Sequence, residues 1–356
     1  MLAGALPVSK PSRDRNKPTH DQSRVPNDLS CVPDPSDAVP IIELPRESDM
    51  RRKHGIALVA ALGHTGFVRI RAPGALSQGC AEAALEACAE LLSCSVGGMV
   101  LDAVPKKREK GSKEFAMLRP EHVARDSRLH SLQGAFCDVK RRVLLGLELG
   151  LGLAPTSLVG RHTDDSDALR LLRYPPGQKY EGPKNTERCY EHMDYGSITL
   201  LLQDMPGLEV RHEASGVWIP VGSGVGSDGS ADGGQVSEDV LIAVNIGKKL
   251  AESPEAAGRL PLAWHRVPGP HSANSLLSAD QLAVEATYER HSIAYFVQEQ
   301  QYHDSAGRGI HPPSDNTPTR YARGATRGPT YEERNRCRTT EARQTSASST
   351  PPQLQG

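Results

Sequence analysis

From residue 168 onward the chain consists of short segments in which apolar and polar residues alternate or β-branched residues cluster, a pattern typical of β-strands. The predicted strands are 168–174, 207–211, 217–221, 239–245, 262–267 and 290–297. The segment 191–202 begins with polar residues and continues as an apolar run, so we expect a buried strand there as well. Strands therefore dominate this half of the protein.

The first half has a different pattern. Apolar residues three or four positions apart predict helices at 51–62, 77–94 and 129–147, with short strands at 39–44 and 66–70 between them. Helices first and many short strands afterwards predict an α+β protein in which an antiparallel sandwich or barrel holds the functional site.

Three segments fall outside this pattern. Residues 1–38 have the polar, Pro-rich composition of a disordered leader. Residues 222–238 consist mainly of Gly, Ser and Asp and predict a flexible insert, and 303–356 form a low-complexity tail rich in Arg, Thr, Ser and Pro. We expect the folded part to lie between the leader and the tail.

Composition excludes several classes of protein. A net charge of −1 over 356 residues gives no indication of binding to nucleic acid or to an anionic membrane. Seven scattered cysteines without a Cys-x-x-Cys pair argue against a disulfide framework or a structural zinc site. No secretory or membrane-spanning segment is recognisable. We expect a monomeric, cytoplasmic protein that acts on small molecules.

Candidate chemistry is concentrated where the 191–202 segment begins. His192 and Asp194 stand two positions apart, so in a strand both side chains would point to the same face. An imidazole and a carboxylate side by side supply two of the three ligands of a facial metal site, and the third must come from elsewhere in the chain.

Two other polar segments invite comparison. His162 and Asp164 have the same spacing, but they belong to an acidic run without an apolar segment directly behind it, and we expect a solvated loop. The basic segment 104–113 contains Lys106, Lys107, Arg108 and Lys110, and we expect a solvated loop there too, in preference to an anion-binding patch.

The order of motifs along residues 39–300 resembles the isopenicillin-N-synthase-like branch of the Fe(II)/2-oxoglutarate-dependent dioxygenases. His192-Met193-Asp194-Tyr195-Gly196 followed by Thr199-Leu200-Leu201 is similar to the His-x-Asp-x-Gly-x-x-Thr-Leu-Leu signature of that family. The other matching segments are Val39–Leu44, Gly66-Phe67-Val68, Leu172-Arg173-Tyr174-Pro175-Pro176, Gly207–Val210, Trp218–Val221, Val244-Asn245-Ile246-Gly247, His265-Arg266-Val267 and Arg290-His291-Ser292.

The resemblance implies a fold and a set of roles. Residues 39–160 would form the N-terminal α/β region, and 161–302 a double-stranded β-helix (jelly-roll) domain with the N-terminal helices packed against it. His192, Asp194 and His265 would bind Fe(II). Arg290 and Ser292 would hold the far carboxylate of the cosubstrate 2-oxoglutarate, with Tyr174 as an additional contact. The reaction implied is oxidation of a small organic substrate by O2, most commonly hydroxylation, with succinate and CO2 as co-products.

Departures from the family pattern leave the substrate open. The intervals from His192 to His265 and from His265 to Arg290 are longer than is usual in the family, and polar residues 268–285 look like an insert in the second interval. The family's usual Asp after Asn-Ile-Gly is Lys248 here. Two alternatives therefore stand beside the dioxygenase: an oxidase of the same family that does not use 2-oxoglutarate, and a catalytically inactive metal-binding relative.

Overall fold

The computed structural model describes residues 39–93, 99–101, 104–108, 113–176, 187–222, 225, 240–256 and 258–300, with two short backbone segments at 302–303 and 309–310. All of them belong to one unit of the chain, which begins at Ala38. The predicted leader 1–38 lies outside these residues. So do nearly all of the predicted insert and of the predicted tail.

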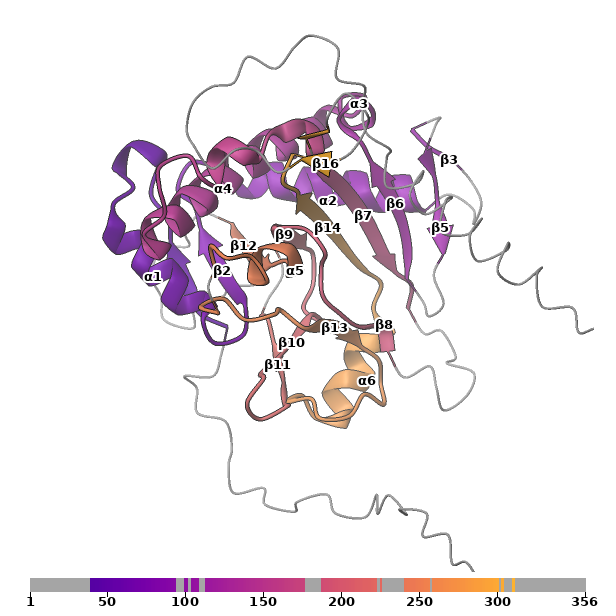
Figure 1. The fold of residues 1–356 in the computed structure, drawn as a ribbon. Helices are drawn as coiled ribbons and strands as arrows, with labels where there is room; N and C mark the ends of the chain where they lie inside the picture. Colours follow the sequence, from indigo (N-terminus) through magenta and orange to yellow (C-terminus); the bar gives the residue numbers. More distant parts are fainter. Residues whose placement is uncertain are drawn as a thin grey trace, which may run out of the picture. The chain divides into compact units, whose positions relative to one another are not determined.

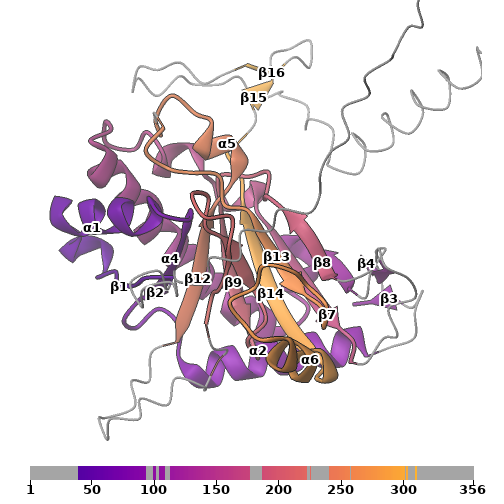
Figure 2. The same cartoon turned by 90° about the horizontal axis from the view of Figure 1, so that it is seen from below.

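The strands form two main sheets, whose arrangement is visible in Figure 1 and Figure 2. In the larger sheet, neighbours are antiparallel except for the parallel pair β1 and β2. Its order is β1 (Ile41–Glu43), β2 (Phe67–Arg71), β12 (Leu241–Ile246), β9 (Ile198–Gln203), β14 (Arg290–Val297), β7 (Ala168–Tyr174), β6 (Glu114–Leu118) and β5 (Lys107–Arg108). The smaller sheet has the order β11 (Trp218–Pro220), β10 (Glu209–Arg211), β13 (His265–Pro268) and β8 (Glu187–His192).

Alternation along the strands of the larger sheet separates two cores. In β14, Ile293, Tyr295 and Val297 belong to a hydrophobic cluster shared with the helices. Ala294 belongs instead to a second cluster, shared with the smaller sheet through residues such as Val210 and Val267. One face of the larger sheet is thus packed against helices and the other against the smaller sheet, which confirms the predicted α+β jelly-roll arrangement.

The helices begin and end where local chemistry allows. The main ones are α1 (Arg52–Leu62), α2 (Gln78–Leu92) and α4 (Ser127–Leu151). Ser77 caps α2 by accepting a hydrogen bond from the Cys80 amide, and Asp126 caps α4 in the same way. Helices α1 and α4 pack at close range, which is possible because Gly55 has no side chain. A Cβ at this position would collide with the backbone of Gly146. In Figure 1, α2 and α4 run along the face of the larger sheet remote from β13.

Shorter elements complete the described chain. None of its helices combines the length and the apolar character needed to span a bilayer. The shorter elements are 3-10 turns at Glu47–Asp49, Val159–Arg161 and Asp164–Ser166, helices α3 (Pro120–Val123), α5 (Lys248–Ala251) and α6 (Ala279–Thr287), and strands β3 (Met99–Val100), β4 (Val104–Pro105), β15 (Tyr302–His303) and β16 (Gly309–Ile310).

Three of these elements fall in segments that we interpreted from the sequence as an insert or a tail. Helix α6 lies at the end of the polar stretch 268–285, where Ser278 and Gln281 form a reciprocal capping box. The strands β15 and β16 pair with each other at the start of the predicted tail. In α6 only Leu282 and Ala286 are buried, so its apolar face was too narrow to be recognised in the sequence.

Candidate metal centre

The sequence predicts one strand over 191–202, but the structure does not contain it. Strand β8 ends at His192, and β9 begins only at Ile198. Between them the chain passes from the smaller sheet to the larger one. The Lys248 amide donates to the Asp194 carbonyl oxygen (2.7 Å), and a Cβ on Gly196 would collide with the Val297 carbonyl oxygen. A bend held by α5 and β14, and not strand alternation, therefore places His192 and Asp194 together.

His265 completes the group from the opposite strand. It is the first residue of β13 and pairs directly with His192 of β8. One ligand atom from each of His192, Asp194 and His265 lies within 4.8 Å of the others. Asp194 Oδ1 is 4.0 Å from His192 Nε2 and 3.8 Å from His265 Nε2. The prediction that these three side chains converge is confirmed.

Hydrogen bonds aim the three ligand atoms at one point. The Nδ1 of His192 bonds the Tyr190 carbonyl oxygen (2.8 Å), and the Nδ1 of His265 bonds the Ala263 carbonyl oxygen (2.9 Å). Because a carbonyl only accepts, each Nδ1 carries the proton and each Nε2 keeps its lone pair. Asn245 donates to Asp194 Oδ2 (3.0 Å) and leaves Oδ1 on the side of the imidazoles. This pattern orients ligands in metal sites.

The charge states also suit a metal. Burial lowers the pKa of His265 to about 4, in spite of the opposing effect of Asp194, so this imidazole is neutral near pH 7. Burial alone would raise the pKa of Asp194, but the two imidazoles and the hydrogen bond from Asn245 reverse that effect and lower it. A neutral imidazole and an ionised carboxylate are the forms that coordinate metal ions.

The predicted cosubstrate residues line the same pocket as the triad. Arg290 is only 2% exposed. Its Nε donates to the Met205 carbonyl oxygen (3.2 Å) and its Nη2 to Gln203 Oε1 (2.7 Å), while its Nη1 is buried without a partner among the described residues. Its Cζ lies 4.9 Å from the ring centroid of Tyr174, and burial raises the pKa of that phenol. Ser292 follows on the same face of β14 and is also buried.

The prediction of a solvated basic loop at 104–113 is wrong for its two ends. Lys106 is buried and pairs with Glu114 (2.9 Å). Lys113 is buried in the pocket and donates to Cys189 Sγ (3.1 Å). Burial would raise the pKa of the Cys189 thiol, but His192 and Lys113 lower it. Nothing in the local sequence marks Lys113 as an inward residue, because its burial depends on the pairing of β6 with the distant strand β7.

The triplet formed by His162 and Asp164 lies outside the pocket, as predicted, but it is not a solvated loop. The ring of His162 is buried, with Nδ1 on the Leu158 carbonyl oxygen (2.6 Å) and Nε2 on Ser197 Oγ (2.7 Å). Burial lowers the pKa of His162. Asp164 pairs with Lys140 and Arg141. Both ring nitrogens of His162 are therefore used within the protein, and none is left for a metal.

Known proteins resemble this chain in sequence over part of its length. No family model matches it. The 2-oxoglutarate-dependent dioxygenase gloF of Glarea lozoyensis is 32% identical over 157 residues, which are 44% of this chain and 41% of the relative. The 2-oxoglutarate-dependent dioxygenase htyE of Aspergillus rugulosus is 32% identical over 163 residues, 45% of this chain and 43% of the relative. The match thus spans about two fifths of the length of these relatives.

Solved structures extend the similarity to most of the fold. A full-length Neurospora crassa protein, solved in complex with alpha-KG, superposes with a TM-score of 0.56 at 19% identity, covering 76% of this chain and 92% of that one. The dioxygenase for auxin oxidation 1 of Arabidopsis thaliana, in complex with 2-oxoglutarate, gives a TM-score of 0.55 at 18% identity, covering 78% of this chain and 96% of that one. The solved structures therefore show that this chain has their fold, and the relatives that match part of its sequence are named 2-oxoglutarate-dependent dioxygenases.

Proposed function

We propose that this protein is an Fe(II)- and 2-oxoglutarate-dependent oxygenase that oxidises a small organic substrate, with succinate and CO2 as co-products. One observation carries the proposal. A buried Arg290, whose Nη1 has no partner among the described residues, shares a pocket with three side chains whose Nε2, Nε2 and Oδ1 atoms converge. Convergent ligands alone would suit several metals, and a lone buried arginine would suit many anions. Their combination in one pocket favours this reaction.

The donor set fits Fe(II). Two imidazoles and one carboxylate form the facial triad of non-haem iron oxygenases and leave coordination positions open. Metal–ligand bonds near 2 Å require His192, Asp194 and His265 to close by less than about 1 Å around an ion. When bound, Fe(II) together with 2-oxoglutarate supplies the activation of O2 that the oxidation requires. The work of the protein is to hold these groups and to keep water out of the site.

The other end of the pocket fits a carboxylate. A buried guanidinium N–H without an acceptor costs free energy, and the far carboxylate of 2-oxoglutarate would supply that acceptor. Gln203 and Met205 fix the orientation of Arg290 through its other nitrogens. Ser292 adds a short hydroxyl donor on the same strand face. Tyr174 covers the guanidinium with its ring.

The test is anaerobic reconstitution with Fe(II), followed by measurement of iron content, 2-oxoglutarate binding and succinate formation on admission of O2. Arg290→Leu should keep its iron, since it leaves the three ligands intact. Its affinity for 2-oxoglutarate should fall by about 2–5 kcal/mol, roughly thirtyfold or more, because one partner of a buried charge pair is removed.

Other outcomes would favour the alternatives. A wild-type protein that binds iron but no 2-oxoglutarate would favour an oxidase that does not use this cosubstrate. Binding of both without succinate formation in any substrate screen would favour an inactive relative. Unchanged 2-oxoglutarate affinity in Arg290→Leu would remove the role assigned to Arg290. A cytoplasmic location and a monomeric state stay predictions.

A further inference from the structure

A second arginine faces the pocket from the strand next to Arg290. Arg170 lies on β7, on the same face as Leu172 and Tyr174, and all three line the pocket. It pairs with Ala294 of β14, four residues beyond Arg290. At the rise of an antiparallel strand this places its backbone about 13 Å from that of Arg290 along the sheet. Arg170 is thus well removed from the position proposed for the far carboxylate of 2-oxoglutarate.

Two aromatic rings contact the guanidinium of Arg170. Its Cζ lies 5.0 Å from the ring centroid of Phe115 and 4.8 Å from that of Phe296. Cation–π contacts of this kind hold a guanidinium in place. They do not accept hydrogen bonds from its N–H groups or neutralise its charge in the way that a carboxylate does. The Nε of Arg170 is buried and has no hydrogen-bond partner among the described residues. The side chain is therefore positioned without being neutralised.

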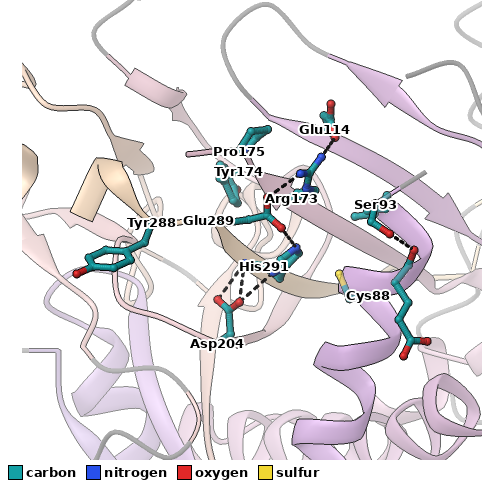
Figure 3. A network of polar contacts seen from close by, with 12 residues as sticks. Cys88, Ser93, Glu114, Arg173, Tyr174, Pro175, Asp204, Tyr288, Glu289 and His291 are labelled. Atoms are coloured by element: carbon teal, nitrogen blue, oxygen red, sulfur yellow. Dashed lines mark hydrogen bonds and ion pairs between the residues drawn. The ribbon is translucent and has the colours of Figure 1, made fainter. Parts of the chain in front are cut away.

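Neighbouring arginines show what a neutralised guanidinium looks like in this protein. Arg173, three residues further on and on the opposite face of β7, contacts Glu114 (2.9 Å) and Glu289 (2.6 Å), as Figure 3 shows. Within the pocket, Arg266 is paired with Glu187 (2.9 Å) and Glu209 (2.8 Å). By contrast, no carboxylate among the described residues lies within ion-pair distance of Arg170. Its positive charge is uncompensated within the described part of the chain.

The charge of the occupied site makes the same point. If the proposed function holds, the charges of Fe(II), Asp194, Arg290 and the 2-oxoglutarate dianion cancel. Lys113 has its own contact with Cys189. Arg170 adds a positive charge that no carboxylate among the described residues pairs, in a partly desolvated pocket where an oppositely charged group is strongly favoured.

We propose that Arg170 anchors a carboxylate of the organic substrate, so that the substrate is an organic acid. This inference rests on the proposed function and narrows its substrate class. The guanidinium presents paired N–H donors that match the two oxygens of a carboxylate. Phe296 borders the guanidinium, lines the pocket and offers apolar surface to the carbon skeleton that carries the acid. Arg170 would thereby hold the substrate in place, while the oxidation occurs at the iron.

The experiment uses matched acids and amides as probes. The protein is loaded with Zn(II), which is redox-inert, and saturated with 2-oxoglutarate. Each acid and its amide are then titrated into it: phenylacetate and phenylacetamide, benzoate and benzamide, and indole-3-carboxylate and its amide. Saturation with 2-oxoglutarate keeps Arg290 occupied. Dissociation constants come from ligand-observed NMR. In the wild type at least one acid should bind about tenfold or more tightly than its amide, as expected for a charge-assisted pair.

Variants assign the preference to the residue. Arg170→Gln should reduce the acid preference to less than about twofold and leave 2-oxoglutarate affinity within about twofold of the parent value. Arg170→Lys should restore part of the preference, because it keeps the charge but not the planar fork. Arg211→Gln, which removes an exposed strand arginine outside the pocket, should bind like the wild type. Thermal unfolding checks that each variant is folded.

The outcomes separate this inference from the proposed function. If no acid binds more tightly than its amide, including the case in which no probe binds, or if the preference survives in Arg170→Gln, the inference is overturned. The proposed function would then still stand, provided that the wild type binds Fe(II) and 2-oxoglutarate. Failure to bind 2-oxoglutarate would instead remove the proposed function, and the acid preference could still be measured in the zinc-loaded protein alone.

Discussion

The two His-x-Asp triplets of this chain have identical spacing and opposite roles. In the first, both nitrogens of His162 are bonded within the protein and Asp164 pairs with two basic residues. In the second, His192 and Asp194 each use one atom for an internal hydrogen bond and leave the other facing a shared point. The first triplet has no ring nitrogen left for a metal, whereas the second leaves one imidazole nitrogen and one carboxylate oxygen available.

The difference arises from where each triplet lies. The His162 triplet precedes β7 in a turn that packs against the loop containing Ser197, so the fold uses its ring to satisfy a buried hydroxyl. The His192 triplet lies where the chain crosses from one sheet to the other, opposite the start of β13. Spacing within a triplet is therefore a weak indication of metal binding. What matters is whether the surrounding strands bring a third ligand and leave lone pairs free.

The largest contrast should come from removing the two carboxylates in turn. Asp194→Ala should lose more than about a hundredfold in iron affinity, because loss of a direct ligand exceeds the ten- to hundredfold typical of an outer partner. Asp164→Ala should keep full iron content and lose at most about 1 kcal/mol of stability, since its ion pairs are partly exposed. Iron analysis after anaerobic reconstitution measures both. Equal loss of iron in the two variants would contradict the assignment.

Much of this contrast was predictable from the sequence. The ordered set of motifs singled out His192, Asp194, His265 and Arg290, which the structure places in one pocket. Alternation alone gave the bounds of β7 and β14 correctly. Such strands are recognisable because one face is mostly apolar and packed against helices.

What could not be predicted depends on contacts between distant segments. The bend after His192 is set by hydrogen bonds from α5 and β14, which the local sequence does not reveal. The burial of Lys113 and of His162 is likewise decided by strands and loops far away in the chain. Local polarity suggested solvent in both cases, and tertiary packing overrode it.

The outer partners of the two triplets allow a finer comparison. Asn245 donates to Asp194, whereas Ser197 bonds His162. Asn245→Ala should lower iron affinity about ten- to hundredfold, because the carboxylate loses the hydrogen bond that orients it. Ser197→Ala should leave iron affinity within about twofold, because it disturbs only the structural triplet. Competition titrations with a metal chelator under anaerobic conditions give both affinities. A larger effect from Ser197→Ala would reverse the assignment.

Loss of the structural histidine should appear in stability and not in iron binding. His162→Ala removes a buried ring and leaves the Ser197 hydroxyl without its partner. We expect a loss of about 1–3 kcal/mol in the free energy of unfolding, measured by urea denaturation. Iron stoichiometry of the folded variant should equal that of the wild type. A variant of normal stability that binds no iron would show that the ring of His162 serves the metal centre after all.

The smallest expected effect is the contribution of His162 to the pH dependence of stability. Burial lowers the pKa of His162 below its ordinary value of 6.5, so on acidification the unfolded chain takes up this proton before the folded protein does. The contribution of this residue to stability is therefore complete above pH 6.5 and is lost as the pH falls below that value. The loss is at most about 1.4 kcal/mol for each pH unit.

His162→Gln, which can still hydrogen-bond but does not titrate, should show a correspondingly shallower decline. Urea denaturation of both metal-free proteins at about pH 7.5 and about pH 5.5 measures the difference, in which the titration of His192 and His265 cancels. Parallel declines would mean that the environment of His162 does not resist protonation, and its structural role would then rest on the hydrogen bond to Ser197 alone.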